Sequence, residues 1–182
     1  DWSHDSGFYL GTWGSNVDFN DNDSTLEVKF YGGYATEQSG LSLDLSVVGY
    51  TYPGSLNSSD YDFIEYAFAV GYGSGPISYS ASVSYSGQFF GGSGEATYLQ
   101  GGVDYELPLG LIASGHVGRQ WVEKNTTYGS PDYTDWSVGV SYAMRGLDLS
   151  LQYLDTDIGN TYNGSTQVGK DGTVIFGVSR SF

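Results

Sequence analysis

The chain has 182 residues, and its 21 acidic residues against 6 Lys and Arg give a formal net charge of −15. This balance excludes nucleic acid as a partner, because phosphate binding requires clustered Lys and Arg. The sequence contains no cysteine, which excludes disulfides, thiolate metal sites and thiol catalysis. Charged residues make up only 15% of the chain, whereas an ordinary soluble domain has about 25%. The length predicts a single domain over residues 1–182.

Composition and periodicity both favour β-structure. The chain has 28 Gly and 17 Tyr; aromatic residues favour strands, and Gly supplies the positive φ of tight turns. No window keeps a helical period of apolar residues, which disfavours an all-α or α/β fold. An uninterrupted apolar run of about eighteen residues is also missing, which excludes a transmembrane helix. It does not exclude transmembrane strands, since only every second residue of such a strand faces lipid.

Alternating polar and apolar residues predict ten strands along the chain. Most are close to the roughly nine to eleven residues that a tilted strand needs to cross a bilayer. Short and long connections alternate, as do the periplasmic turns and extracellular loops of transmembrane barrels. The predicted strands are Gly7–Phe19, Thr25–Ala35, Leu41–Tyr52, Tyr61–Tyr72, Ile77–Gln88, Ala96–Leu107, Leu111–Val122, Trp136–Met144, Leu147–Asp155 and Gly172–Phe182.

The two faces of these strands decide which side meets water. A soluble barrel would turn its apolar face inward and carry a charged surface. Here the polar face is mostly Ser, Gly and Ala with scattered acids, which is a poor soluble surface. The apolar face carries aromatic residues near both strand ends, as the girdles of membrane barrels do. The predicted periplasmic girdle is Tyr34, Tyr72, Tyr105, Tyr142 and Phe182, and the outer one is Tyr85, Trp121, Trp136 and Tyr153.

The prediction is therefore an all-β, antiparallel, up-and-down transmembrane β-barrel in a bacterial outer membrane. Asp1–Trp2 precedes Gly7 at the same spacing at which Asp104–Tyr105 precedes Gly110. If Asp104–Tyr105 ends a strand, Trp2 ends a further one. Because barrels of this class have even strand counts, an N-terminal hairpin absent from this sequence would bring ten strands to twelve. The alternative is a ten-stranded barrel with a polar N-terminus.

Several segments resemble the TorF-like porins, a family of bacterial outer-membrane proteins. Ser6–Phe19 (SGFYLGTWGSNVDF) carries the most specific part, the W-x-S-N-V-D-F string at its end. The resemblance continues in Tyr52–Gly54, Tyr61–Glu65 and the ending Val178–Phe182 (VSRSF), so that it covers nearly the whole chain. Family members begin with a further strand pair before the position of Asp1. The resemblance implies an outer-membrane barrel and adds little about the solute.

Ionisable and amide side chains on the predicted inner face are the functional candidates. They include six acids and one Lys, and an acidic lumen favours cations. The alternative is that these groups pair with one another and plug a narrow barrel. The alternating serines of Ser78–Ser86 instead argue for an open interior. The pore-lining candidates are Glu27, Lys29, Asp44, Glu65, Gln100, Asp104, Glu106, His116, Asp148 and Gln152.

The predicted function is a porin-like channel for small hydrophilic solutes that favours cations, with outer-membrane lipid and lipopolysaccharide as its surroundings. The alternative is a closed structural barrel that engages a partner or surface polymer through its acidic outer loops. Those predicted loops contain twelve acids, Asp135 and Asp157 among them. Strict alternation puts Arg119 on the lipid face near the outer rim, unless a bulge near Gly118 turns it inward.

An enzymatic function is not expected. Outer-membrane enzymes use His with an acid or a nucleophile at a rim or on the lipid face. His4 lies in a predicted periplasmic turn, and His116 is inward and in the middle of a strand. The run Asn20–Asp23 lacks the spacing and the closing Glu of an EF-hand calcium loop. No catalytic residue, cofactor or metal site is therefore predicted.

Overall fold

A computed structural model describes residues 1–18, 24–56, 59–125, 131–158 and 171–180, with the backbone of 161–162 and 165–166. One antiparallel sheet of eleven strands dominates, in which each strand pairs with the next along the chain except that β10 pairs with β13. The small strands β11 (Thr161–Tyr162) and β12 (Ser165–Thr166) pair separately. The eleven are β1 (Trp2–Ser3), β2 (Phe8–Asn16), β3 (Leu26–Gln38), β4 (Leu41–Thr51), β5 (Phe63–Ser74), β6 (Ile77–Ser86), β7 (Ala96–Glu106), β8 (Leu111–Val122), β9 (Tyr133–Met144), β10 (Leu147–Thr156) and β13 (Thr173–Arg180).

The ten predicted strands are all present, with shifted ends. β3 continues three residues beyond its predicted end, because Ser39 and Gly40 adopt φ of 54° and 80° and form a two-residue hairpin turn of the type that follows strand twist. β9 starts three residues before its predicted start. β1 is the further strand that the Asp1–Trp2 spacing predicts, and its Trp2 pairs with Leu10 of β2. Phe182, the predicted end of the last strand, lies outside the described residues.

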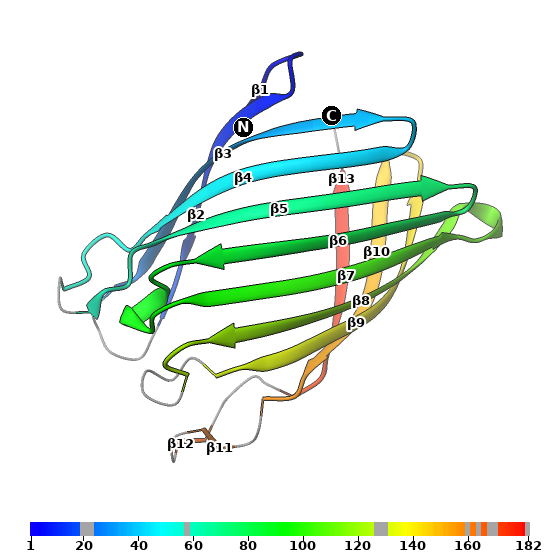
Figure 1. Ribbon diagram of the computed structural model, residues 1–182. Helices are drawn as coiled ribbons and strands as arrows, with labels where there is room; N and C mark the ends of the chain where they lie inside the picture. Colours follow the sequence, from blue (N-terminus) through cyan, green and yellow to red (C-terminus); the bar gives the residue numbers. More distant parts are fainter. Residues whose placement is uncertain are drawn as a thin grey trace.

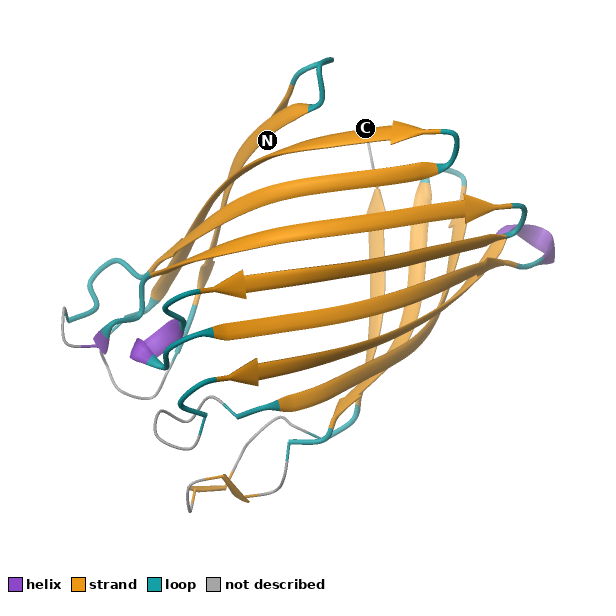
Figure 2. Ribbon diagram, viewed as in Figure 1, coloured by secondary structure: helices purple, strands orange, loops and turns teal. Residues whose placement is uncertain are grey.

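The sheet curls strongly, so that β10 and β13 lie behind the wall formed by β4 to β8 (Figure 1). Short turns gather at one end of the strands and long connections at the other (Figure 2). The only helical pieces among the described residues are short 3-10 turns, including η2 (Phe90–Gly92) and η3 (Pro108–Gly110). No described helix is long and apolar enough to cross a membrane. Between β1 and β13 the described residues form no ladder, so the sheet is open there.

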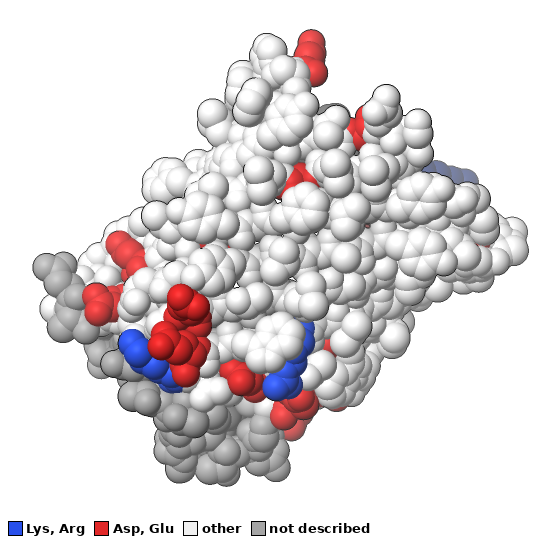
Figure 3. Space-filling view, in the orientation of Figure 1, with Lys and Arg blue, Asp and Glu red and all other residues white. Residues whose placement is uncertain are grey.

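The apolar residues lie on the convex face and are exposed. Phe30 is 58% exposed, Leu45 63% and Phe176 67%. The space-filling view shows a broad uncharged band over the strands, with most visible charged side chains near the long connections (Figure 3). A soluble barrel needs the opposite arrangement, with its apolar face buried. The fold is therefore the inside-out one that the sequence predicts, with polar residues on the concave face.

Candidate functional site

The cross-strand register places all ten predicted pore-lining residues on the concave face. Two acids join them: Glu37 because β3 is longer than predicted, and Asp135 because β9 begins earlier. Asp135 was expected in a loop, and this expectation is wrong. Among the described strand residues, the concave face therefore carries eight acids and one Lys.

A compact cluster surrounds Lys29 near the long connections. Its Nζ lies 3.2 Å from Glu27 Oε1 and 4.7 Å from the ring centroids of both Trp13 and Tyr50. Tyr52 lies just beyond β4 and donates a hydrogen bond of 2.6 Å from its hydroxyl to Glu27 Oε2. Burial, followed by that hydrogen bond, raises the pKa of Tyr52 above its ordinary value, so the phenol stays a neutral donor.

A second network joins β6, β7, β8 and β9 at His116. Its Nε2 lies 2.8 Å from Gln100 Oε1, and Gln100 Nε2 donates to Ser82 Oγ at 2.8 Å. Its Nδ1 lies 3.4 Å from Asp135 Oδ1. His116 thus meets an acid, but the amide of Gln100 stands between it and the hydroxyl of Ser82. The side chains of Asp135, His116, Gln100 and Ser82 thus form a series of polar contacts, in which His116 does not contact the Ser82 hydroxyl as a general base would contact a nucleophile.

Tyrosines reach across whole strands on this face. The Tyr98 hydroxyl donates to both carboxylate oxygens of Asp135, at 3.1 and 2.9 Å, although β7 and β9 are separated by β8. The crossing passes over Gly118 of β8, where any Cβ would overlap the Tyr98 ring and hydroxyl. Gly118 therefore makes the hydrogen bond possible, because only Gly leaves room for the phenol.

The same construction recurs between β2 and β4. The Tyr9 hydroxyl donates to Asp44 at 2.9 and 2.8 Å by crossing β3 over Gly33. Sequence reasoning missed these tyrosines, because it considered only charged, amide and His side chains. The signal available was an inward Gly on the strand between an inward Tyr and an inward Asp, with one of the two directly paired to the Gly and the other two residues away from its pairing position.

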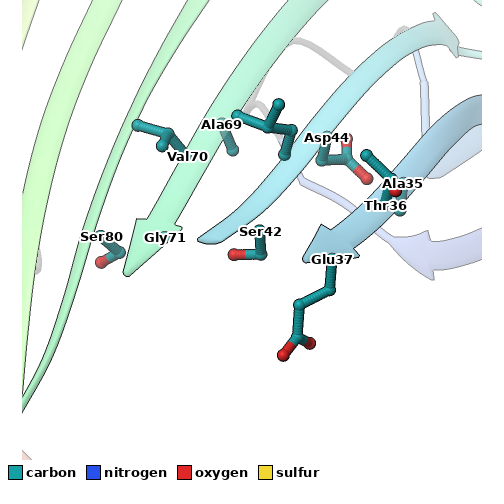
Figure 4. A pocket seen from close by; sticks show the side chains of 10 residues that line it. Ala35, Thr36, Glu37, Ser42, Asp44, Ala69, Val70, Gly71 and Ser80 are labelled. Atoms are coloured by element: carbon teal, nitrogen blue, oxygen red, sulfur yellow. The ribbon is translucent and has the colours of Figure 1, made fainter. Parts of the chain in front are cut away.

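Near the short turns the concave face is lined by small residues and is hollow. A cavity of about 460 Å³ lies between β3, β4, β5 and β6. Figure 4 shows the Asp44 carboxylate beside small side chains on the walls of this cavity. Its polar lining includes Glu37, Ser42 and Ser80, and Ala69 and Gly71 leave the space unfilled.

The remaining predicted residues are dispersed. Asp104, Glu106 and Asp148 lie on the concave face toward the short turns, and Gln152 Nε2 donates to Ser137 Oγ at 2.9 Å. Arg119 lies on the convex face, because Gly118 and Arg119 pair with Asp135 and Thr134 without a bulge. No group of three or more potential metal-binding side chains occurs within the described residues.

The predicted girdle residues that are described all lie on the convex face. Tyr72, Tyr105 and Tyr142 lie one or two residues from the end of their strands, whereas Tyr34 lies four residues from the end of the lengthened β3. Trp121 and Tyr85 lie one residue from the opposite strand ends. Trp136 and Tyr153 lie three residues from those ends, and Phe182 is outside the described residues.

A family model described as a bacterial protein of unknown function (Gcw_chp) matches residues 1–182. The chain belongs to this family. The family description carries neither the TorF-like name nor an activity, so that finer assignment stays a prediction. No match was found among curated proteins.

Two solved structures share the fold of this Gcw_chp member. A porin aligns with a TM-score of 0.57 and 14% identity over 100% of this chain. The outer membrane channel DcaP of Acinetobacter baumannii aligns with a TM-score of 0.53 and 19% identity over 94% of this chain. The chain spans 60% and 54% of the length of these two proteins. The alignments confirm a porin-like antiparallel fold.

Proposed function

We propose that this protein is an outer-membrane channel that passes small hydrophilic solutes and favours cations. The observation that carries the proposal is the concave face, where eight acids meet one Lys among the described strand residues. A polar cleft with one sign of charge concentrates ions of the opposite sign. Rings of acidic side chains are a common source of cation selectivity in channels.

The exposed apolar face supports a membrane location. Every backbone polar group in a bilayer must be satisfied, so a curled sheet with an apolar convex face fits lipid once its edges are paired. The aromatic residues Tyr72, Tyr105, Tyr85 and Trp121, which lie close to their strand ends, would then meet the two membrane interfaces. The long connections would face outward and the short turns the periplasm. A porin and an outer membrane channel among structures of similar fold are consistent with this function.

Single-channel recording in planar bilayers under a KCl gradient tests the proposal. The protein would first be shown to be folded by heat-modifiable gel migration. We expect steady conductance and a reversal potential of the sign given by selective cation flow. Silence from folded protein, or an anion-selective reversal potential, would refute the channel or its selectivity, respectively. Silence would also favour the structural barrel, with its function in the acidic loops.

A further inference from the structure

A small pocket on the concave face is lined mainly by aromatic side chains. It encloses about 230 Å³ near the long connections, between β4, β5, β6, β7, β8 and β9. This volume is below the roughly 300 Å³ at which pockets begin to accept drug-sized ligands, so only a small ligand fits. Five aromatic rings and one carboxylate dominate the lining: Tyr50, Phe63, Phe89, Tyr98, Tyr133 and Glu65.

Most hydroxyl and amide groups of this pocket already have partners within the protein. Tyr98 donates to Asp135, and Tyr133 donates to Gln120 Oε1 at 3.3 Å. Ser84 contacts the carboxylate of Glu65. A sugar needs several polar partners of its own in a binding site. What the pocket offers instead is aromatic surface with a single acid, which is the composition that holds cations without hydrogen-bond donors.

The adjoining wall already holds an ammonium group in this way. Lys29 Nζ lies 4.7 Å from the ring centroid of Tyr50, and Tyr50 also stacks on Phe63 with centroids 4.2 Å apart and planes at 10°. Phe63 in turn meets Phe89 edge to face at 4.9 Å. These contacts fix the rings before any ligand arrives, so little conformational entropy is lost on binding.

We propose that this pocket binds a small organic ammonium ion, such as a quaternary ammonium group, with Glu65 facing the charge and the rings of Tyr98, Tyr133 and Phe89 facing its methyl groups. The inference rests on the proposed function, because it names a class of solute for the same acidic channel. It goes beyond general cation preference, since a pore that is merely acidic attracts ions in solution without an aromatic binding site.

Isothermal titration calorimetry of the folded protein in detergent, with tetramethylammonium chloride replacing NaCl at constant ionic strength, tests the site. We expect saturable binding with a dissociation constant of about 1–10 mM, in keeping with a few cation–π contacts. Glu65→Gln should weaken binding about tenfold, and Phe89→Leu about threefold. Glu95→Gln is the matched control, since it removes the same charge from an exposed loop residue outside the pocket and should leave the affinity unchanged.

Three results would overturn the site: no saturable binding by folded protein, equal weakening by Glu65→Gln and Glu95→Gln, or preferred binding of glucose that Glu65→Gln abolishes. Phe89→Leu keeps the test decisive if Glu65→Gln does not fold. The bilayer recordings separate this inference from the proposed function. Conductance without tetramethylammonium binding refutes only the site, whereas binding without conductance refutes only the channel.

Discussion

The two ends of the concave face differ in the size of the side chains that their strands carry. Near the short turns, Ala69, Gly71 and Ser80 leave a cavity of about 460 Å³. Near the long connections, the same strands carry rings and charges that contact one another across the sheet, as Lys29 and Tyr50 do.

The difference in crowding comes from side-chain volume, since acids occur at both ends. A channel of this kind would have a wide end near the short turns and a crowded, narrow end near the long connections. Since the field of a charge is stronger where less water surrounds it, discrimination among solutes would be concentrated at the crowded end.

The largest expected effect is on stability and comes from adding one methyl group at the crowded end. Gly118→Ala puts a Cβ where the Tyr98 hydroxyl lies, and 2.9 Å from Asp135 Oδ2. We expect the free energy of unfolding to fall by about 3 kcal/mol, from overpacking together with the lost hydrogen bond. Denaturant titration of the folded protein in detergent measures this change.

The matched control is Gly101→Ala, on the convex face of the neighbouring strand β7. A Cβ there meets nothing closer than the carbonyl oxygen of Ser80 at 3.6 Å. Its unfolding free energy should stay within about 0.5 kcal/mol of wild type. Equal losses in the two variants would mean that Gly118 acts through backbone propensity and not through the Tyr98–Asp135 contact.

Filling the wide end is expected to have the next largest effect, on conductance. Ala69→Trp adds a large ring to the wall of the cavity, and Ala81→Trp adds the same ring to the convex face of the adjacent strand. We expect the first variant to lose roughly half of the single-channel conductance and the second to keep it. If Ala69→Trp conducts like wild type, the cavity is not on the route of the ions.

Replacing the inward Lys at the crowded end should change ion selectivity more than replacing an acid at the wide end. Lys29→Met leaves the carboxylate of Glu27, now 3.2 Å from Lys29 Nζ, without its counter-charge in the crowded region. The cation-to-anion permeability ratio should rise roughly twofold. Asp44→Asn at the wide end should lower it by only about a fifth, because salt and water screen that charge better. Reversal potentials in a KCl gradient give both ratios, and a larger effect of Asp44→Asn would reverse the assignment of the two ends.

The sequence predicted the strands and their two faces because alternation is a local property. Ile77 to Ser86 shows this, since every second residue is Ser and each lies on the concave face. The crowded end could not be predicted in the same way. Its contacts join residues such as Tyr98 and Asp135, which are 37 positions apart, and their meeting depends on register and on the turn lengths between three strands. The true start of β9, which moves Asp135 from a loop to the concave face, was hidden because Tyr133 and Asp135 break the expected small-residue pattern.

The smallest effect is expected just beyond the strands at the crowded end. Asp157 follows β10 and accepts a hydrogen bond of 2.6 Å from the backbone N–H of Thr134. That bond, reinforced by the Thr134 side chain and by Arg119, lowers the pKa of Asp157 below its ordinary value. A lowered pKa means that the carboxylate stabilises the fold above the ordinary aspartate range, and that this stabilisation is lost as the pH falls through the folded-state pKa.

Wild type and Asp157→Asn should therefore differ most in thermal midpoint near neutral pH and converge in acid. The side chain is 45% exposed, so the neutral-pH difference should be only a degree or two, about what an exposed ion pair gives. Melting curves followed by circular dichroism between pH 7 and pH 3 measure it. A gap that stays constant with pH would show that Asp157 acts by shape and hydrogen bonding alone. A gap that widens in acid would contradict the lowered pKa, because a carboxylate with a lowered pKa loses its stabilising effect when it is protonated.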